Sequence, residues 1–437
     1  MIKKEEMFDT PKKEVSLDVT DLRNFVYDMS RCIKCKGCYW VDHIYMPGID
    51  FMVRCPSNLW KDFDSYGAFG KMRIGIALFE GRLSWSEKLL EILYACTLCG
   101  ACDVGCKRNL DLEIGLTLEA LRIKAVKDRV APLPAHKKII ENIQKTHNKF
   151  GVDNKGRRAW AEKVPLDDTS DLIYFVGCSS SFVNREIPLA VSEVLSKTNK
   201  KFALFDNEWC CGNVPYSVGA YEEAKAIARR NVEYVRSKGC KTVLLSCAEC
   251  YRMWKVDYPK LLGISTDDLG FEVIHFIEYV EKAKKEGLLK LTKPIKKRLT
   301  YHDSCGVSRL CDPWINWKGT RGWMGIVEPK LKRRRGTYGL YFQAREILSS
   351  IPGLKFVEMP RTRENSLCCG AGRGTKEAFP QFTEFIVNER MREVKHVGAE
   401  LLVSACPWCK TNFKRAIKDG DGIEVLDISE LVALSME

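Results

Sequence analysis

Cys368-Cys369-Gly370 decides the fold of this chain, read together with Cys305 upstream and Cys406-Pro407-Trp408-Cys409 downstream. These five thiols form a pattern of one cysteine, a vicinal pair and a C-x-x-C. Five thiols are too many for one disulfide and one more than a tetrahedral zinc site uses. A glycine after two adjacent cysteines lets the backbone turn, so that both thiolates face one metal centre. The pattern predicts an irregular multi-iron cluster, with zinc on four thiols or a vicinal disulfide as alternatives.

The same five-thiol pattern occurs earlier, as Cys178, then Cys210-Cys211-Gly212, then Cys247-Ala248-Glu249-Cys250. The vicinal pair and the C-x-x-C are separated by 35 residues in the first copy and 36 in the second, which indicates an internal repeat. We call the two groups of cysteines the first and the second set. Their members are Cys178, Cys210, Cys211, Cys247 and Cys250, and Cys305, Cys368, Cys369, Cys406 and Cys409.

The second copy contains an insertion that the first copy lacks. Between the single cysteine and the vicinal pair lie 31 residues in the first copy and 62 in the second. The extra length, at about 311–339, holds three tryptophans and a run of basic residues. Loops of this length are usually functional. Docking of a partner subunit, binding of an acidic substrate and a plain solvated insertion are the alternatives for it.

Two further cysteine blocks precede the repeat, each with a C-x-x-C-x-x-C loop and one remote cysteine. This pattern holds a cubane [4Fe–4S] cluster, and in two-cluster ferredoxins the fourth cysteine of each run binds the other cluster. Gly37, Gly100 and Gly105 lie where the backbone must fold around inorganic sulfide. A pair of zinc sites is the alternative. We expect one cubane on Cys32, Cys35, Cys38 and Cys106, and the other on Cys96, Cys99, Cys102 and Cys55.

Composition and charge narrow the class of protein. The 437 residues are enough for two or three domains, and 45% hydrophobic with 29% charged residues is typical of a globular protein. The net charge of +13 would suit nucleic acid, an anionic surface or an acidic partner, but no nucleic-acid-binding module accompanies it. Twenty cysteines in a cytoplasmic chain indicate metal ligation or redox chemistry, because disulfides are rare there. We expect no nucleic-acid partner.

The chain is expected to stay in the cytoplasm. It has no run of eighteen apolar residues, and its first residues lack the apolar core of a signal peptide. It therefore has no direct membrane span in this interpretation and would reach the inner face of a membrane through a partner subunit.

Hydrophobic periodicity divides the chain into a helical part and an α/β part. Amphipathic patterns over 72–79, 86–93 and 110–127 predict helices around the cubane cysteines. From residue 171, continuous apolar runs that end near cysteines predict buried parallel strands alternating with helices. The expected organisation is an arm (1–22), a helical ferredoxin domain (23–135), a linker (136–170), a first cysteine-rich domain (171–290) and a second one (291–437).

With these motifs, the chain from about Ser30 onward resembles the D subunit of heterodisulfide reductase, or the B and C subunits fused. The segment 359–372, which contains Cys368-Cys369-Gly370, is especially similar to that family. The resemblance implies a helical ferredoxin domain with two cubanes, followed by two repeated α/β CCG domains. It implies a noncubane [4Fe–4S] cluster on each set, where the two clusters together reduce a disulfide. The cysteines of both sets are then catalytic.

The resemblance also implies partners. No flavin or nucleotide fingerprint is evident, so an electron-donor subunit is needed, either a cytochrome b-type membrane subunit or a flavin/iron–sulfur subunit. The substrate would be a disulfide or a thiol. His302, three residues before Cys305, is a candidate proton donor for the released thiols, or else a histidine satisfied by local backbone.

Related cysteine-rich domains leave a second function open. They also occur in glycerol-3-phosphate, lactate and glycolate oxidation systems, in sulfite-reduction membrane complexes and in benzoyl-CoA reductase complexes. The alternative is therefore a non-catalytic electron-transfer subunit of a membrane-associated dehydrogenase, sulfite-reduction or benzoyl-CoA reductase-type complex. A zinc-bearing scaffold is a third possibility.

Overall fold

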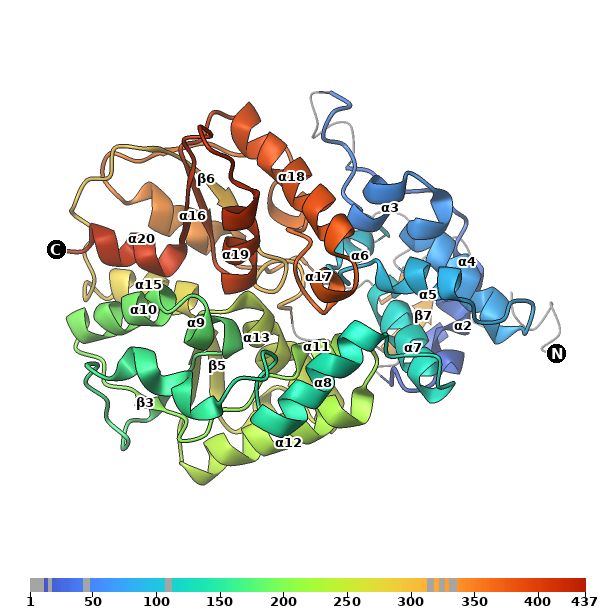
Figure 1. Cartoon of the computed structure of the whole chain (residues 1–437), viewed down its shortest axis with the longest axis horizontal. Helices are drawn as coiled ribbons and strands as arrows, with labels where there is room; N and C mark the ends of the chain where they lie inside the picture. The colour runs from blue at the N-terminus through green and yellow to red at the C-terminus, as the bar shows by residue number, and fades with distance from the viewer. Residues whose placement is uncertain are drawn as a thin grey trace.

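The computed structural model describes residues 12–14, 18–41, 48–106, 112–312, 318–321, 327–329 and 336–437. Within them the chain forms a helical unit followed by two α/β units (Figure 1). The helical unit, blue to teal in the figure, lies at one end of the molecule. The first α/β unit, green to yellow, and the second, yellow-orange to red, lie against each other at the other end. This arrangement confirms the predicted fold class.

The helical unit packs short helices around a shared apolar core. Helices α4 (Ala68–Phe79), α5 (Glu87–Tyr94) and α7 (Ile114–Lys127) cover the stretches where helices were expected. Helix α5 begins at Glu87 because the Ser86 side chain accepts a hydrogen bond from the Leu89 backbone nitrogen at 3.2 Å. The other elements are η1 (Leu22–Phe25), α2 (Val26–Arg31), α3 (Pro56–Lys61), η3 (Asp64–Tyr66) and α6 (Ala101–Cys106).

The first α/β unit contains a parallel sheet with the strand order β3-β2-β4-β5. Its central strands, β2 (Leu172–Phe175) and β4 (Thr242–Leu245), are the continuous apolar runs of the sequence, and each ends shortly before a cysteine. The other elements are α9 (Cys178–Phe182), α10 (Glu186–Lys197), β3 (Ala203–Leu204), α11 (Asn213–Ser217), α12 (Tyr221–Ser237), α13 (Ala248–Arg252), the π-helix η5 (Met253–Asp257), α14 (Tyr258–Leu262), η6 (Asp267–Leu269), β5 (Glu272–His275) and α15 (Phe276–Lys285).

The second α/β unit repeats this topology with the strand order β9-β6-β10-β11. Strands β6 (Arg298–His302) and β10 (Leu401–Ser404) are central and pair in parallel, with Leu299 opposite Leu401. The other elements are α16 (Tyr341–Ser349), β9 (Lys355–Phe356), η8 (Arg363–Asn365), α17 (Thr375–Ala378), α18 (Pro380–His396), α19 (Pro407–Ala416), β11 (Glu424–Asp427) and α20 (Ile428–Ser435).

The two α/β units pack through equivalent elements. Helix α10 of the first unit contacts α20 of the second, and α15 of the first contacts α16 of the second. By position in the repeat, α10 corresponds to α16 and α15 to α20, so the two contacts are reciprocal. Reciprocal contacts of this kind are the property of a two-fold interface. The repeat therefore forms an approximate internal dimer.

The segment expected as a linker, 136–170, carries ordered structure. Helix α8 (Pro134–Thr146) starts with a proline in its first turn and packs against both α11 and α17, one from each α/β unit. The 3₁₀ helix η4 (Asn154–Ala161) follows and packs against α9. This connection therefore touches both α/β units instead of spanning open solvent.

The N-terminal arm and the insertion meet in a small antiparallel sheet. Strand β1 (Lys12–Glu14) pairs with β7 (Lys318–Arg321), which pairs with β8 (Val327–Glu328). The arm expected over 1–22 and the insertion expected over 311–339 are thus in contact. The residues that drew attention to the insertion lie outside the described residues: Trp314, Trp317, Trp323, Lys330, Lys332, Arg333, Arg334 and Arg335.

Candidate metal centres at the junction of the three units

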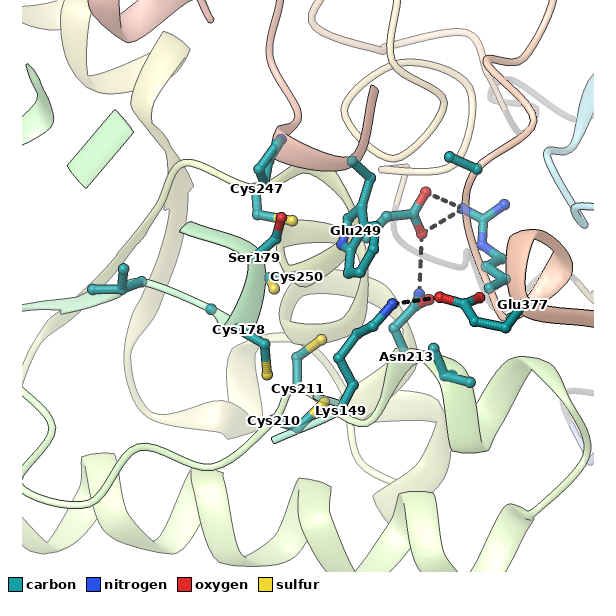
Figure 2. Close-up of a pocket in the computed structure, with 18 residues that line it drawn as sticks. Lys149, Cys178, Ser179, Cys210, Cys211, Asn213, Cys247, Glu249, Cys250 and Glu377 are labelled. Atoms are coloured by element: carbon teal, nitrogen blue, oxygen red, sulfur yellow. Dashed lines mark hydrogen bonds and ion pairs between the residues drawn. The ribbon is translucent and has the colours of Figure 1, made fainter. Parts of the chain in front are cut away.

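All five thiols of the first set line one cavity between the two α/β units (Figure 2). Cys178 and Cys247 follow central strands, and the vicinal pair precedes α11. Gly177, at φ +79°, and Gly212, at φ +78°, provide the left-handed turns beside Cys178 and Cys211 that a side chain would strain. The second unit closes the cavity with Ala371, Arg373, Gly374, Glu377, Pro407 and Trp408.

The first set contains a thiol with marked thiolate character. Hydrogen bonds from Cys210 and Cys250 lower the pKa of Cys211 to about 6, against the opposing effect of burial. A thiolate is the form of cysteine that binds metal. Against the effect of burial, hydrogen bonds with Cys250 and Cys406 also lower the pKa of Cys247 to about 6. Five buried thiols around one cavity, two of them with a lowered pKa, suit a multi-iron cluster better than a disulfide.

A buried ion pair that sequence reasoning missed supports the first set. Arg157 Nη1 lies 2.6 Å from Glu208 Oε1, and Arg157 Nη2 donates to Cys178 Sγ at 3.5 Å. Glu208 also accepts hydrogen bonds from the backbone nitrogens of Val176 and Gly177, at 2.8 and 2.9 Å. Arg157 belongs to the expected linker, and no sequence motif marks either residue.

The second set is equally buried. Cys409 Sγ lies 3.2 Å from Cys369 Sγ, and Cys368 lies within hydrogen-bonding reach of both Cys305 and Cys369. The Cys406 thiol interacts with that of Cys409. The structure therefore brings the five thiols, which span more than a hundred residues of sequence, into one group.

His302 lies in the second set and is fully buried. One ring nitrogen of His302 and the sulfurs of Cys369 and Cys409 all lie within 4.8 Å of one another. Arg390 Nε donates to His302 Nδ1 at 3.3 Å. Burial lowers the pKa of His302, although the hydrogen bond with Cys369 opposes that effect. The partners of the imidazole are therefore side chains instead of local backbone.

Cysteines of different sets touch one another. The thiols of Cys247 and Cys406, which are equivalent positions of the repeat, lie within hydrogen-bonding reach across the interface of the α/β units. The thiol of Cys99, in the helical unit, lies within hydrogen-bonding reach of the Cys368 thiol in the second set. The candidate metal centres therefore form a continuous series from the helical unit through the second set to the first.

The cysteines of the helical unit form two groups. A cavity lined by four of them also contains Lys71, and burial raises the pKa of Cys55 to about 11, with Cys96 and Cys99 adding to the effect. Burial also raises the pKa of Cys106 to about 12, and Cys32 and Cys35 are among its charged neighbours. The cavity brings Cys55 to the second cysteine block, which is compatible with the crossed ligand sets of two-cluster ferredoxins; the two full ligand sets stay a prediction. The thiols lining the cavity are Cys55, Cys96, Cys99 and Cys102.

Glycines allow the close approach of these loops. Gly100 has φ +75°, and a β-carbon at Gly105 would lie 2.2 Å from the Gly37 carbonyl oxygen. The loops that carry Cys38 and Cys106 can therefore touch only because Gly105 lacks a side chain.

Arg373 joins all three units at this junction. Its Nη2 lies 2.8 Å from Glu249 Oε2 and 3.6 Å from Cys305 Sγ. Glu249 stands between the two cysteines of the first C-x-x-C in the sequence. Its Nη1 donates to the carbonyl oxygens of Thr97 and Leu98 at 2.6 and 2.9 Å. Figure 2 shows the Glu249 carboxylate, with its ion pair to the arginine drawn as dashed lines, beside the cavity of the first set.

Comparison with known proteins agrees with this architecture. A 4Fe-4S dicluster domain matches residues 28–110, and a cysteine-rich domain (CCG) matches residues 172–255 and 331–414. The D subunit of the dihydromethanophenazine:CoB–CoM heterodisulfide reductase of Methanosarcina barkeri is 32% identical over 97% of this chain and 98% of its own length. The chain belongs to the family of heterodisulfide reductase D subunits. The predicted resemblance is confirmed.

The chain is also similar to proteins that are named as other oxidoreductases or their subunits. The B subunit of fumarate reductase (CoM/CoB) of Methanothermobacter marburgensis is 28% identical, over 79% of this chain and 62% of that protein. EtfAB:quinone oxidoreductase of Syntrophomonas wolfei is 25% identical, over 79% of this chain and 47% of that protein. The names support a redox role. Among the described residues, no helix has the length and hydrophobicity to cross a bilayer.

Proposed function

We propose that this chain is the iron–sulfur catalytic subunit of a heterodisulfide reductase-type complex. It would receive electrons through two cubane clusters and reduce a disulfide at two noncubane clusters. The observation that carries the proposal is the contact between Cys247 and Cys406. With the two sets side by side, clusters bound to both of them could act on the same disulfide.

The cysteines have the number and grouping that these clusters require. Each cubane would take four thiolates and each noncubane cluster five. Bound there, the clusters would supply one-electron transfer and the redox chemistry that opens a disulfide. The helical unit would hold the cubanes on Cys32, Cys35, Cys38 and Cys106, and on Cys96, Cys99, Cys102 and Cys55.

The protein supplies a dry, partly polar environment for the two sets. All ten thiols are buried, which excludes water that would compete for electrons and metal. Lys149, Glu377 and Trp408 also line the cavity at the first set. Lys149 Nζ lies 2.7 Å from Glu377 Oε1 and 3.5 Å from the centre of the Trp408 ring (Figure 2). We propose that the disulfide approaches through this polar edge.

A donor subunit completes the proposal. It would be a cytochrome b-type membrane subunit or a flavin/iron–sulfur subunit, docked near the helical unit, and it would place the chain in the cytoplasm or at the inner face of a membrane. The sheet of β1, β7 and β8 is a candidate for that contact, because it combines the arm and the insertion.

The relatives favour a second candidate function. The B subunit of fumarate reductase (CoM/CoB) and EtfAB:quinone oxidoreductase are similar to most of this chain, so the chain could instead pass electrons without reducing a disulfide. In that case a substrate thiol would have no effect on the clusters.

Electron paramagnetic resonance (EPR) of anaerobically purified, oxidised protein separates the two functions. A disulfide reductase should develop a new paramagnetic signal when candidate thiols are added, and Cys369→Ser should abolish it. Cys240→Ser is the matched control, because Cys240 is buried outside both sets with its thiol 3.8 Å from the Ser170 carbonyl oxygen. Thiols that leave the oxidised spectrum unchanged would favour the relay.

A further inference from the structure

The two sets can be compared position by position, because the repeat aligns them. Counting back three residues from the single cysteine reaches Phe175 in the first unit and His302 in the second. Both rings occupy the same place: Phe175 packs on Trp254 with centroids 5.3 Å apart, and His302 packs on Phe413 at 4.9 Å. Trp254 and Phe413 each follow their C-x-x-C by four residues. The histidine therefore replaces a phenylalanine in an otherwise equivalent core.

Each set has one arginine that donates to the sulfur of its single cysteine. Arg157 donates to Cys178 Sγ at 3.5 Å, and Arg373 donates to Cys305 Sγ at 3.6 Å. Each arginine is neutralised by a buried glutamate: Arg157 by Glu208 at 2.6 Å, and Arg373 by Glu249 of the first unit at 2.8 Å. The second set differs in two polar contacts, the His302 imidazole and a hydrogen bond from Cys305 Sγ to Glu249 Oε1 at 3.4 Å.

Arg390 fixes the tautomer of His302. Its Nε donates to His302 Nδ1, so the ring proton resides on Nε2. Nε2 is the nitrogen left to donate to Cys369, whose sulfur lies within 4.8 Å of a His302 ring nitrogen. Arg390 is itself held by Glu393 at 2.8 Å and by the Arg361 carbonyl oxygen at 2.8 Å. The equivalent residue of the first unit, sixteen positions before its C-x-x-C, is Asn231, which bonds to Tyr258 instead.

We infer that His302 is a positioning residue that hydrogen-bonds the Cys369 ligand and makes the second site easier to reduce than the first. This inference rests on the proposed function, since it requires an iron–sulfur cluster in the second set. A hydrogen bond to a ligating thiolate stabilises the more negative, reduced cluster and raises its reduction potential. The second site also adjoins the helical unit, through Cys99 and Cys368. Electrons from the cubanes would therefore reduce the cluster of the second site before that of the first.

This role differs from the proton donor expected from the sequence. A positioning role needs no transfer of a proton, since the Nε2–H can remain directed at one sulfur throughout the reaction.

Redox titration followed by EPR tests the inference with two substitutions of similar volume. His302→Gln keeps an N–H donor near the position of Nε2, whereas His302→Met removes it. Both variants lose the aromatic ring equally. We expect the second-site potential to fall in His302→Met and to stay close to the wild-type value in His302→Gln. Phe175→Leu, which alters ring packing at the equivalent position, should leave the second-site potential unchanged.

The outcomes separate the inference from the proposed function. Equal shifts in the Gln and Met variants, with iron content retained, would overturn the hydrogen-bonding role. Loss of iron from both variants would also overturn it, because His302 would then be a metal ligand. Wild-type protein without iron in the second set would instead contradict the proposed function itself, and the inference with it.

Discussion

At the scale of single residues, the junction of the three units depends on a buried charge pair. Arg373 and Glu249 are both buried, and their ion pair lies between the first C-x-x-C, Cys305 and the loop that carries Cys99. Removal of one partner from a buried pair leaves an uncompensated charge in a medium of low polarity. The pair therefore acts on the stability of the junction as well as on its electrostatics.

We predict that Arg373→Gln destabilises the protein by about 3–5 kcal/mol, because the Glu249 carboxylate would remain buried without its cation. Anaerobic urea denaturation, followed by tryptophan fluorescence, measures the change. The double variant Arg373→Gln/Glu249→Gln should recover part of the loss, since it removes both charges. A double variant no more stable than Arg373→Gln would show that the charge pair is not the cause.

The sequence predicted the thiols but not their supporting residues. Cysteine spacing carries information about ligands, so both sets and the two cubane groups could be expected from the sequence alone. Arg157, Glu208, Arg373 and Glu249 have no periodic or spacing signal, because their importance arises from contacts between segments distant in sequence. His302 was expected as a candidate proton donor, which stays a prediction, and only the structure shows its contact with Arg390.

At the scale of elements, α8 links the two α/β units. Its His136 is buried, and His136 Nε2 donates to the Gly374 carbonyl oxygen at 3.1 Å. The other ring nitrogen, Nδ1, has no hydrogen-bond partner among the described residues. Protonation of Nδ1 would bury an unpaired N–H close to Arg122. Burial, with a further contribution from Arg122, therefore lowers the pKa of His136 to about 4.

This lowered pKa predicts a pH-dependent stability. The unfolded chain binds a proton at His136 below about pH 6.5, whereas the folded chain does so only near pH 4, so stability is full above pH 6.5 and falls between these values. The loss should reach at most about 3 kcal/mol at pH 4. His136→Gln keeps the donor to Gly374 without the titration. Thermal unfolding between pH 5 and 7 should therefore vary less in the variant; identical pH profiles would contradict this account.

Secondary structure was predictable where one pattern dominates. The four central strands of the α/β units lie in the part of the chain, from residue 171 onward, where apolar runs ending near cysteines predicted buried parallel strands. Helix α8 was expected only as part of a linker. This helix is mostly polar, but three of its apolar side chains, Ile139, Ile140 and Ile143, are buried. Tertiary packing, which a single sequence does not display, gives this segment its role.

At the scale of the whole molecule, the repeat forms an approximate two-fold pair with the helical unit attached at one side (Figure 1). The symmetry brings Cys247 and Cys406 together. The helical unit breaks the symmetry, because Cys99 reaches Cys368 of the second set. The same asymmetry appears in His302, which replaces Phe175. A symmetric scaffold with one asymmetric input suits a subunit that receives electrons at one site and delivers them at two.

The proposed function requires an iron–sulfur cluster in each of the two sets. The most direct test is to measure iron, acid-labile sulfide and zinc in anaerobically purified protein. We predict about sixteen iron atoms per chain, four for each of four clusters, with matching sulfide and little zinc. About eight iron atoms together with zinc in the two cysteine-rich domains would contradict the account, because the sets would then be structural metal sites.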